Sequence, residues 1–244
     1  MSSQNKLNYN LKIPQELKSL SALFESVKQK LYIVGGFVRD SLLNKNAYDI
    51  DICSPLKLDQ VKSLLRNTSF SYKTKNKQMG TATISINNLK FEYTVFRTDF
   101  YALDGKHSPI GVDFVRSIKI DALRRDFYVN AIYFDIQANK VVDPTGKGLS
   151  DLENNILEVI PHANNTFKED AVRILRLIKF SALLGFEIES NTLEQAKEHS
   201  YLLNNITPAR LKKELSFIQK LSTQEKEKIN NILSAVLGRT FNKI

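Results

Sequence analysis

The stretch VGGFVRDSLLNKNAYDIDI, residues 34–52, decides the fold of the first half of this chain. Two glycines, Gly35 and Gly36, follow the short apolar run LYIV at residues 31–34, which reads as a buried strand. Glycine turns a chain sharply at little steric cost, and FVRDSLL directly after the pair fits a helix that begins at the turn. The pattern therefore predicts a strand, a glycine turn, a helix and a second strand.

The second predicted strand carries two acidic residues, Asp49 and Asp51. Residues i and i+2 of a strand point to the same face, so the two carboxylates share a face while Ile50 and Ile52 turn to the core. Adjacent carboxylates repel each other unless a cation lies between them, and Mg²⁺ prefers oxygen ligands. Asp49 and Asp51 are therefore candidate metal ligands and catalytic residues. The simpler alternative is an exposed strand edge with a solvated acidic face.

The glycine turn also suits a phosphate group. Backbone N–H groups of Gly35 and Gly36 can approach phosphate oxygens at a helix start, where the helix dipole favours anions. Arg39, one turn into the helix, adds a guanidinium fork that can bind a triphosphate. A tight strand-to-helix corner would explain the glycines alone, but turn, arginine and acid pair in this order are more specific. Together they predict a site for a metal ion and a triphosphate.

Hydrophobic periodicity extends this unit into a mixed α/β domain. Helical spacing of apolar residues is present at residues 13–30 and 56–67. Three strand-like runs follow, at residues 70–75, 81–87 and 89–97, with a hairpin turn predicted at residues 87–90. Residues 98–111 are predicted to form a long mobile loop.

The character of the chain changes after Val141. Residues 141–155 form a linker rich in Gly, Pro and Asp, and almost every run from Phe167 onward has helical periodicity. Predicted helices cover residues 168–185, with Gly185 as its cap, and the run opened by Thr207 and Pro208. The expected plan is an α/β head over residues 1–145, a helical neck over 146–220 and the start of a helical body over 221–244.

Composition limits the classes of function. With 244 residues, a net charge of +9 and a pI near 9.4, the chain can bury a core and favours an acidic partner, most often nucleic acid, although a Lys/Asn bias without function is the alternative. A single cysteine, Cys53, excludes a disulfide framework. Neither a signal peptide nor a membrane span is visible, so we expect a soluble cytoplasmic protein. The histidines His107, His162 and His199 lack zinc-ligand spacing.

Four motifs in the same order resemble the class II nucleotidyltransferases, the family of the tRNA CCA-adding enzymes and the bacterial poly(A) polymerases. They are VGGFVRDSLL with YDIDI, then RRDFYVNA at Arg124–Ala131, then VDPTGKGLSDL, then EDAVRILR at Glu169–Arg176. The resemblance covers roughly residues 31–220. It implies a nucleotidyltransferase palm, a mixed sheet with flanking helices, followed by an all-helical neck.

Charged residues on the predicted neck helix fall within one arc, because residues three apart shift by about 60° around the axis. They are Asp170, Arg173 and Arg176. Cytosine and adenine each place an amine beside a ring-nitrogen acceptor, so a carboxylate and a guanidinium could select them and reject U and G. An ordinary charged helix surface is the alternative. The resemblance implies the selective role for Asp170 and Arg173, with Arg176 in support.

The resemblance assigns further nucleotide contacts. It implies that Arg125 contacts the phosphates and that Asp126 helps to hold the ribose; a basic helix start paired with local acids is the alternative. Lys179 stands where family members often have arginine, so it keeps the charge but loses the planar fork. Glu92 is a possible third carboxylate, or else a solvent-facing strand residue.

We therefore expect a Mg²⁺-dependent tRNA nucleotidyltransferase that uses CTP and ATP. A basic Gly-Arg-Arg-Phe stretch, usual in poly(A) polymerases of this class, is absent from this sequence. A poly(A) polymerase and a non-catalytic RNA-binding module are the alternatives, and CCA, CC-only and A-only addition stay open. The chain ends soon after the neck, which suggests a minimal enzyme, a truncated product or a partner subunit that supplies the remaining grip on tRNA.

Overall fold

The computed structural model describes residues 6–47, 49–161 and 165–237, so Tyr48 of the predicted acidic strand and His162 lie outside the described residues. The chain divides into two compact units. The head unit comprises the described residues of Ser3–Asp99 and Gly111–Glu153, and the neck unit those of Phe100–Ile110 and Asn154–Ile244. The predicted fold class, an α/β head followed by helices, is confirmed. The boundaries predicted after residues 145 and 220 stay predictions.

A seven-stranded sheet forms the centre of the head unit, in the order β3-β4-β5-β2-β1-β8-β9. Strands β2 and β5 run parallel, whereas the other neighbouring pairs are antiparallel, so the sheet is mixed as predicted. The bounds of its strands are β1 Tyr32–Val34, β2 Ile50–Ser54, β3 Ser71–Asn76, β4 Thr81–Ile86, β5 Leu89–Val95, β8 Tyr133–Asp135 and β9 Lys140–Val142.

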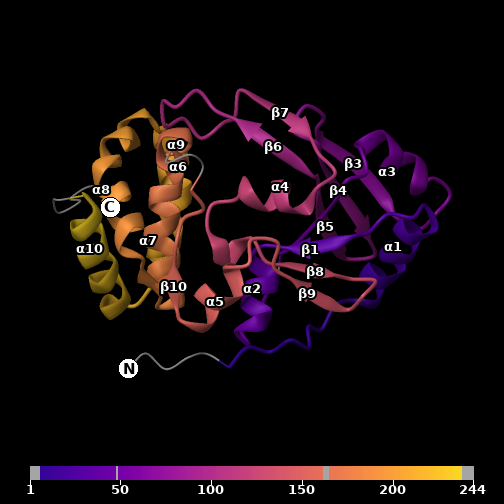
Figure 1. The fold of residues 1–244 in the computed structure, drawn as a ribbon, viewed down its shortest axis with the longest axis horizontal. Coiled ribbons are helices and arrows are strands. Elements are labelled where there is room, and N and C mark those ends of the chain that lie inside the picture. The colour runs from indigo at the N-terminus through magenta and orange to yellow at the C-terminus, as the bar shows by residue number, and fades with distance from the viewer. Residues whose placement is uncertain (1–5, 48, 162–164, 238–244) are drawn as a thin grey trace. The chain divides into compact units, whose positions relative to one another are not determined.

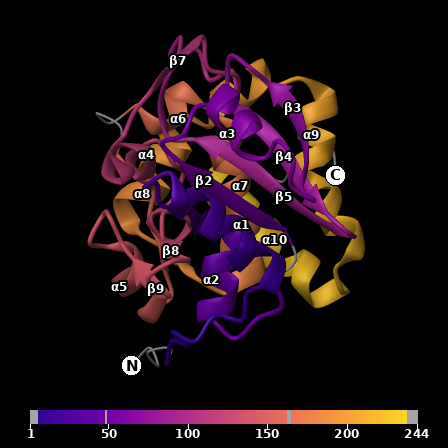
Figure 2. The ribbon, with the colours of Figure 1, turned by 90° about the vertical axis from the view of Figure 1, so that its right-hand side faces the viewer.

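Two helices, α1 (Gln15–Ser26) and α3 (Leu58–Leu64), cover one face of this sheet (Figures 1 and 2). The ring of Phe24 in α1 lies 6.0 Å from the ring of Tyr93 in β5, and Phe24 is fully buried. Tyr72 of β3 donates its hydroxyl hydrogen to the backbone oxygen of Leu58 in α3. Burial of these apolar faces is the main stabilising force of the head.

The opposite face of the sheet, which we call the site face, carries Asp51, Cys53 and Tyr133. Asp51 pairs in register with Val34, which also pairs with Tyr133, so these side chains share a face. The further head elements are α2 (Gly36–Leu42), α4 (Ile118–Leu123), the 3-10 turn η1 (Tyr128–Asn130) and α5 (Gly148–Glu153). Gly35, with φ of 82°, makes the predicted turn between β1 and α2.

Two local predictions need correction, and one alternative is only partly right. RRDFYVNA does not start a helix, because α4 ends at Leu123 and Arg124 is its C-cap, but its arginines do pair with a local acid, Asp121. The ends of the predicted loop at residues 98–111 are ordered, since β6 (Arg97–Phe100) and β7 (Gly111–Phe114) form a two-stranded sheet. Finally, the predicted linker contains helix α5.

The neck unit is a set of packed helices, in which α7 contacts α9 and α10 (Figure 1). Gly185 caps α7 with φ of 74°, and Thr207 caps α9, as predicted. The predicted helix over residues 168–185 is instead broken, because Asp170 has extended angles between α6 and α7. The element bounds are α6 Thr166–Glu169, α7 Val172–Leu184, α8 Ser190–Glu198, η2 Ser200–Asn205, α9 Pro208–Leu215, η3 Ser216–Lys220, α10 Thr223–Leu237, β10 Ile156–Leu157 and β11 Glu187–Ile188.

None of the helices in residues 6–47, 49–161 and 165–237 combines the length and apolar character that a membrane span requires.

Candidate active site

The glycine turn, Asp51 and one arginine lie close together on the site face. Asp51 is exposed in β2, and Asp49 is exposed one residue before that strand begins. A Cβ atom placed on Gly35 would lie 3.8 Å from Oδ2 of Asp51 and 4.0 Å from Nη1 of Arg125. The structure therefore brings a negative and a positive group together at a turn where a bare backbone is required.

The two exposed carboxylates fit a magnesium site that is completed by substrate. Among the described residues no group of three or more His, Cys, Asp or Glu side chains could hold a metal ion. Mg²⁺ usually keeps several waters and is bound by one or two carboxylates together with substrate phosphates. Asp49 and Asp51 offer that donor set. Glu92 pairs in register with Asp51, but its carboxylate forms an ion pair with Lys75 at 2.5 Å.

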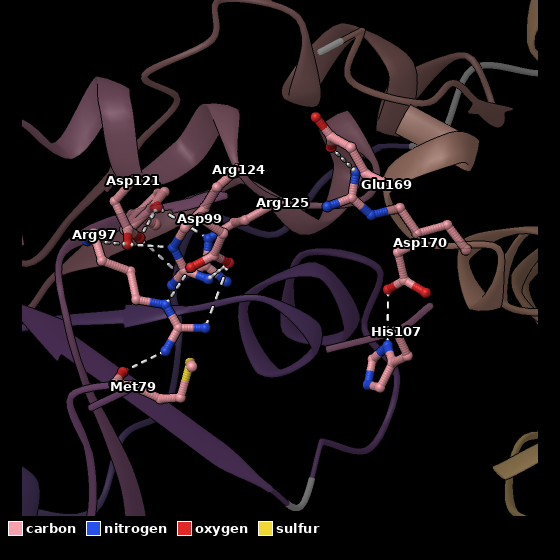
Figure 3. Close-up of polar contacts among 11 residues, drawn as sticks. Met79, Arg97, Asp99, His107, Asp121, Arg124, Arg125, Glu169 and Asp170 are labelled. Atoms are coloured by element: carbon pink, nitrogen blue, oxygen red, sulfur yellow. Dashed lines mark hydrogen bonds and ion pairs between the residues drawn. The ribbon is translucent and has the colours of Figure 1, made fainter. Parts of the chain in front are cut away.

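A buried carboxylate, that of Asp121, organises the arginines above the site face (Figure 3). Nε of Arg124 lies 2.8 Å from its Oδ1, and Nη2 of Arg125 lies 3.1 Å from its Oδ2. Tyr133 donates its hydroxyl hydrogen to the same Oδ2 at 2.6 Å. Burial by itself would raise the pKa of Asp121, but Arg124, Arg125 and the Tyr133 hydrogen bond outweigh it and lower this pKa to about 2.

The arginine predicted to bind a triphosphate, Arg39, is buried at 6% exposure and makes contacts within the head. Its Nη1 donates to Oδ1 of Asn130 at 2.6 Å, and its Nε and Nη2 donate to Asp40. Asn130 in turn donates to Oδ1 of Asp126 at 3.0 Å. Asn130 thus connects two predicted nucleotide ligands, Arg39 and Asp126, whose roles toward a nucleotide stay predictions.

In the neck unit, Asp170 and Arg173 do not lie on one helix as predicted. Asp170 precedes α7, and its Oδ1 accepts a hydrogen bond from the backbone N–H of Val172 at 2.9 Å. Its Oδ2 lies 2.8 Å from Nδ1 of His107 (Figure 3). Because an ionised carboxylate only accepts, His107 is the donor. Asp170 is therefore held at the helix start, where a negative charge is favoured.

The three basic residues of α7 each lie over an aromatic ring. Arg173 lies 5.6 Å from the ring centre of Tyr101, Arg176 lies 5.3 Å from that of Phe180, and Lys179 lies 5.4 Å from that of Phe217. Cations over ring faces are attracted by the ring quadrupole. Arg173, at 4% exposure, also lies 3.4 Å from a carboxylate oxygen of Glu169. Base selection by these residues stays a prediction.

Residues 100–110, predicted as a mobile loop, are bonded to the neck helices. The N–H of Gly105 donates to the backbone oxygen of Lys168 at 2.6 Å, and the N–H of Ala171 donates to the oxygen of Gly105 at 3.0 Å. Asn205 donates to the backbone oxygen of Asp104 at 2.8 Å. These hydrogen bonds hold the segment against the backbone on both sides of Asp170, at Lys168 and at Ala171.

Sequence reasoning missed Asp121, Asn130 and Tyr133 in the head unit, and His107 beside Asp170 in the neck unit. A signal existed for Asp121, which precedes Arg124 and Arg125 by three and four residues, the spacing of ion pairs on a helix. Asn130 stands in the motif RRDFYVNA, but nothing in the sequence indicates its hydrogen bond to the distant Arg39. Tyr133 and His107 had no periodic or motif signal.

Comparison with known protein families gives two matches. Residues 31–158 match the poly A polymerase head domain, and residues 185–218 match a family described as a probable RNA and SrmB-binding site of polymerase A. The first match includes the glycine turn, the acid pair and the Asp121 cluster. The second lies wholly within the neck unit.

Curated relatives and solved structures agree with these matches. The chain is 37% identical over 205 residues to the CCA-adding enzyme of Streptococcus thermophilus, covering 83% of this chain and 48% of the relative. It is 34% identical over 202 residues to that of Pediococcus pentosaceus, covering 82% and 49%. The chain thus spans about half the length of these curated relatives.

Two solved structures are similar over most of the chain. The Bacillus stearothermophilus CCA-adding enzyme in complex with CTP has a TM-score of 0.75 and 27% identity, covering 96% of this chain and 54% of that one. A tRNA nucleotidyltransferase complexed with a primer tRNA and an incoming ATP analog has a TM-score of 0.70 and 27% identity, covering 89% and 62%.

Proposed function

The chain belongs to the class II nucleotidyltransferases, in their CCA-adding branch, and on that premise we propose that it adds C, A or both to the 3′ end of tRNA. The substrates would be CTP and ATP, and pyrophosphate would be released. The observation that carries the proposal is the meeting of Gly35, Asp51 and Arg125 on the site face. Enzymes of this family depend on a metal ion, which we propose is Mg²⁺ here.

The head unit would perform the transfer. The oxygen of the RNA 3′ hydroxyl would attack the α-phosphorus. The bond between that phosphorus and the oxygen bridging to the β-phosphate would break, and the hydroxyl proton would pass to solvent. Asp49 and Asp51 would hold the magnesium, whose charge favours an ionised hydroxyl and offsets charge on the phosphate. The turn at Gly35 leaves room for phosphate oxygens beside the backbone, and Arg125 supplies a guanidinium that stays charged.

The neck unit would choose the base. Oδ2 of Asp170 lies 2.8 Å from a ring nitrogen of His107, a contact in which the carboxylate acts as an acceptor. An exocyclic amine of cytosine or adenine has the same donor character, while Arg173 could donate to the neighbouring ring nitrogen. Arg176 and Lys179 would add positive charge on the same helix, α7. A tRNA substrate and these nucleotides would be met in the cytoplasm, so the proposal includes that location.

The test supplies tRNA that lacks its terminal CCA with labelled CTP or ATP and Mg²⁺. We expect incorporation of C, A or both, and a fall of at least about 100-fold with Asp51→Asn. Asp59→Asn is the matched control, because Asp59 is an exposed acid of α3 on the opposite face of the sheet. No incorporation by the folded protein would refute the proposal, and long A tails on generic RNA would select a poly(A) polymerase.

A further inference from the structure

A closed triangle of hydrogen bonds holds the guanidinium of Arg125. Its Nε donates to the hydroxyl oxygen of Tyr133 at 3.0 Å, and its Nη2 donates to Oδ2 of Asp121 at 3.1 Å. The Tyr133 hydroxyl donates to the same Oδ2 at 2.6 Å, which completes the triangle. The guanidinium also lies over the Tyr133 ring, 5.1 Å from its centre. These contacts fix both the position and the plane of the guanidinium group.

The corner of the triangle at Asp121 is itself held by further donors. Asp121 has no exposed surface, and its second oxygen, Oδ1, accepts from Nε of Arg124 at 2.8 Å and from the backbone N–H of Arg97 at 3.2 Å. Four donors therefore surround one carboxylate. A buried carboxylate that moves away from its donors loses hydrogen bonds that water cannot replace. Asp121 therefore supports Arg125 in one position.

The triangle uses only one edge of the Arg125 guanidinium. The remaining nitrogen, Nη1, is the atom that would lie 4.0 Å from a Cβ on Gly35, where Oδ2 of Asp51 would lie 3.8 Å away. The supported edge faces the protein, and the other nitrogen faces the turn that suits a phosphate group. An arginine with one edge held in this way is pre-organised for an anion on its other side.

We infer that Tyr133 and Asp121 are positioning residues, which aim Nη1 of Arg125 at the triphosphate of the incoming nucleotide. This inference rests on the proposed function and adds to it the device that orients the phosphate ligand. A purely structural cluster is the competing explanation, in which the same contacts only attach the end of α4 to the sheet. The two explanations differ in one outcome: only the positioning role predicts that a mutation in the triangle weakens the binding of ligands that carry a triphosphate.

Tyr133→Phe is the decisive variant, because it removes one hydroxyl and keeps the ring. Titration calorimetry with CTP, ATP and inorganic tripolyphosphate should show about a tenfold loss of affinity, equal for all three ligands since Arg125 would contact phosphates and not bases. The same substitution made in Arg125→Ala should cause no further loss. In turnover assays the nucleotide KM should rise with kcat little changed, because ground-state and transition-state binding weaken together.

Tyr93→Phe is the matched control. Tyr93 is also fully buried, and its hydroxyl bonds to the side chain of Ser54 and the backbone oxygen of Leu56 on the other face of the sheet. Tyr93→Phe should leave the affinities for CTP, ATP and tripolyphosphate unchanged. Asp121→Asn, which keeps the shape of the side chain, should weaken the three ligands at least as much as Tyr133→Phe.

The outcomes separate this inference from the proposed function. Unchanged affinities in Tyr133→Phe, additive losses with Arg125→Ala, or an equal loss in Tyr93→Phe would overturn the positioning role while wild-type CTP binding upheld the function. A wild-type protein that binds neither CTP nor tripolyphosphate would overturn both.

Discussion

At the scale of single residues, Gly35 has a backbone conformation that other residues adopt at a cost. Its φ is 82°, whereas the neighbouring Gly36 is the first residue of α2 and has no such constraint. A side chain at Gly35 would also enter the space beside Asp51. Of the two adjacent glycines, only Gly35 has a backbone conformation that disfavours a side chain.

We predict that Gly35→Ala lowers the free energy of unfolding by about 1–2 kcal/mol, because an L side chain is strained in that region. Gly36→Ala should be neutral or stabilising by up to about 1 kcal/mol, since alanine suits a helix better than glycine. Urea unfolding of the two variants measures the difference. Equal effects of both substitutions would contradict the conformational explanation.

Asp121 predicts a pH dependence of stability. Its pKa is lowered to about 2 in the folded head, so its contribution is present above its ordinary pKa near 3.8 and is lost as the pH falls toward 2. The contribution is roughly 2 kcal/mol at neutral pH, by the linkage between pKa and stability. Unfolding free energies measured between pH 5 and pH 2 should fall more steeply for the wild type than for Asp121→Asn. The same slope in both would contradict this assignment.

At the scale of elements, the segment 100–110 and the neck helices form one unit through Gly105. A Cβ on Gly105 would lie 2.9 Å from Cβ of Leu202 and 3.3 Å from Cβ of Ala171, in addition to the strain of a φ of 75°. Gly185 has nearly the same φ, 74°, but nothing lies within 4 Å of its Cβ position. A comparison of substitutions at Gly105 and Gly185 therefore separates the cost of crowding from the cost of backbone strain.

We predict that Gly105→Ala costs at least about 1 kcal/mol more than Gly185→Ala, because only the first substitution crowds the packed segment. Amide hydrogen exchange should rise in residues 100–110 for Gly105→Ala alone. Urea unfolding supplies the energies. Equal costs, with unchanged exchange in that segment, would show that its packing on the neck is weak.

Most elements of the fold follow from local pattern, and most of the site does not. Hydrophobic patterns predict α1, α3 and the strands β1 to β5, since burial of one face is a local property, but they did not predict β8 and β9. The extended conformation of Asp170 has a different cause, because its carboxylate caps α7 and accepts from His107, which lies far away in sequence. Tyr133 acquires its role only when the folded sheet brings its hydroxyl to Asp121 and Arg125. Contacts of this kind have no periodic signature.

At the scale of the whole molecule, the net charge of +9 predicts salt-dependent binding of RNA. Each phosphate that a lysine or arginine neutralises releases a counterion, so affinity falls with the logarithm of salt concentration. We expect RNA affinity to fall about tenfold or more between 50 and 200 mM salt, which a filter-binding titration would measure. Affinity that does not change with salt would contradict an electrostatic mode of binding.

The measurement that tests the central claim most directly is a crystal structure of the protein with CTP and Mg²⁺. Our account predicts phosphate oxygens against the backbone at Gly35 and Gly36, Mg²⁺ between those oxygens and Asp51, and Nη1 of Arg125 in contact with the triphosphate. A triphosphate bound elsewhere, with Asp49 and Asp51 both remote from it, would contradict the assignment of the site face as the catalytic surface.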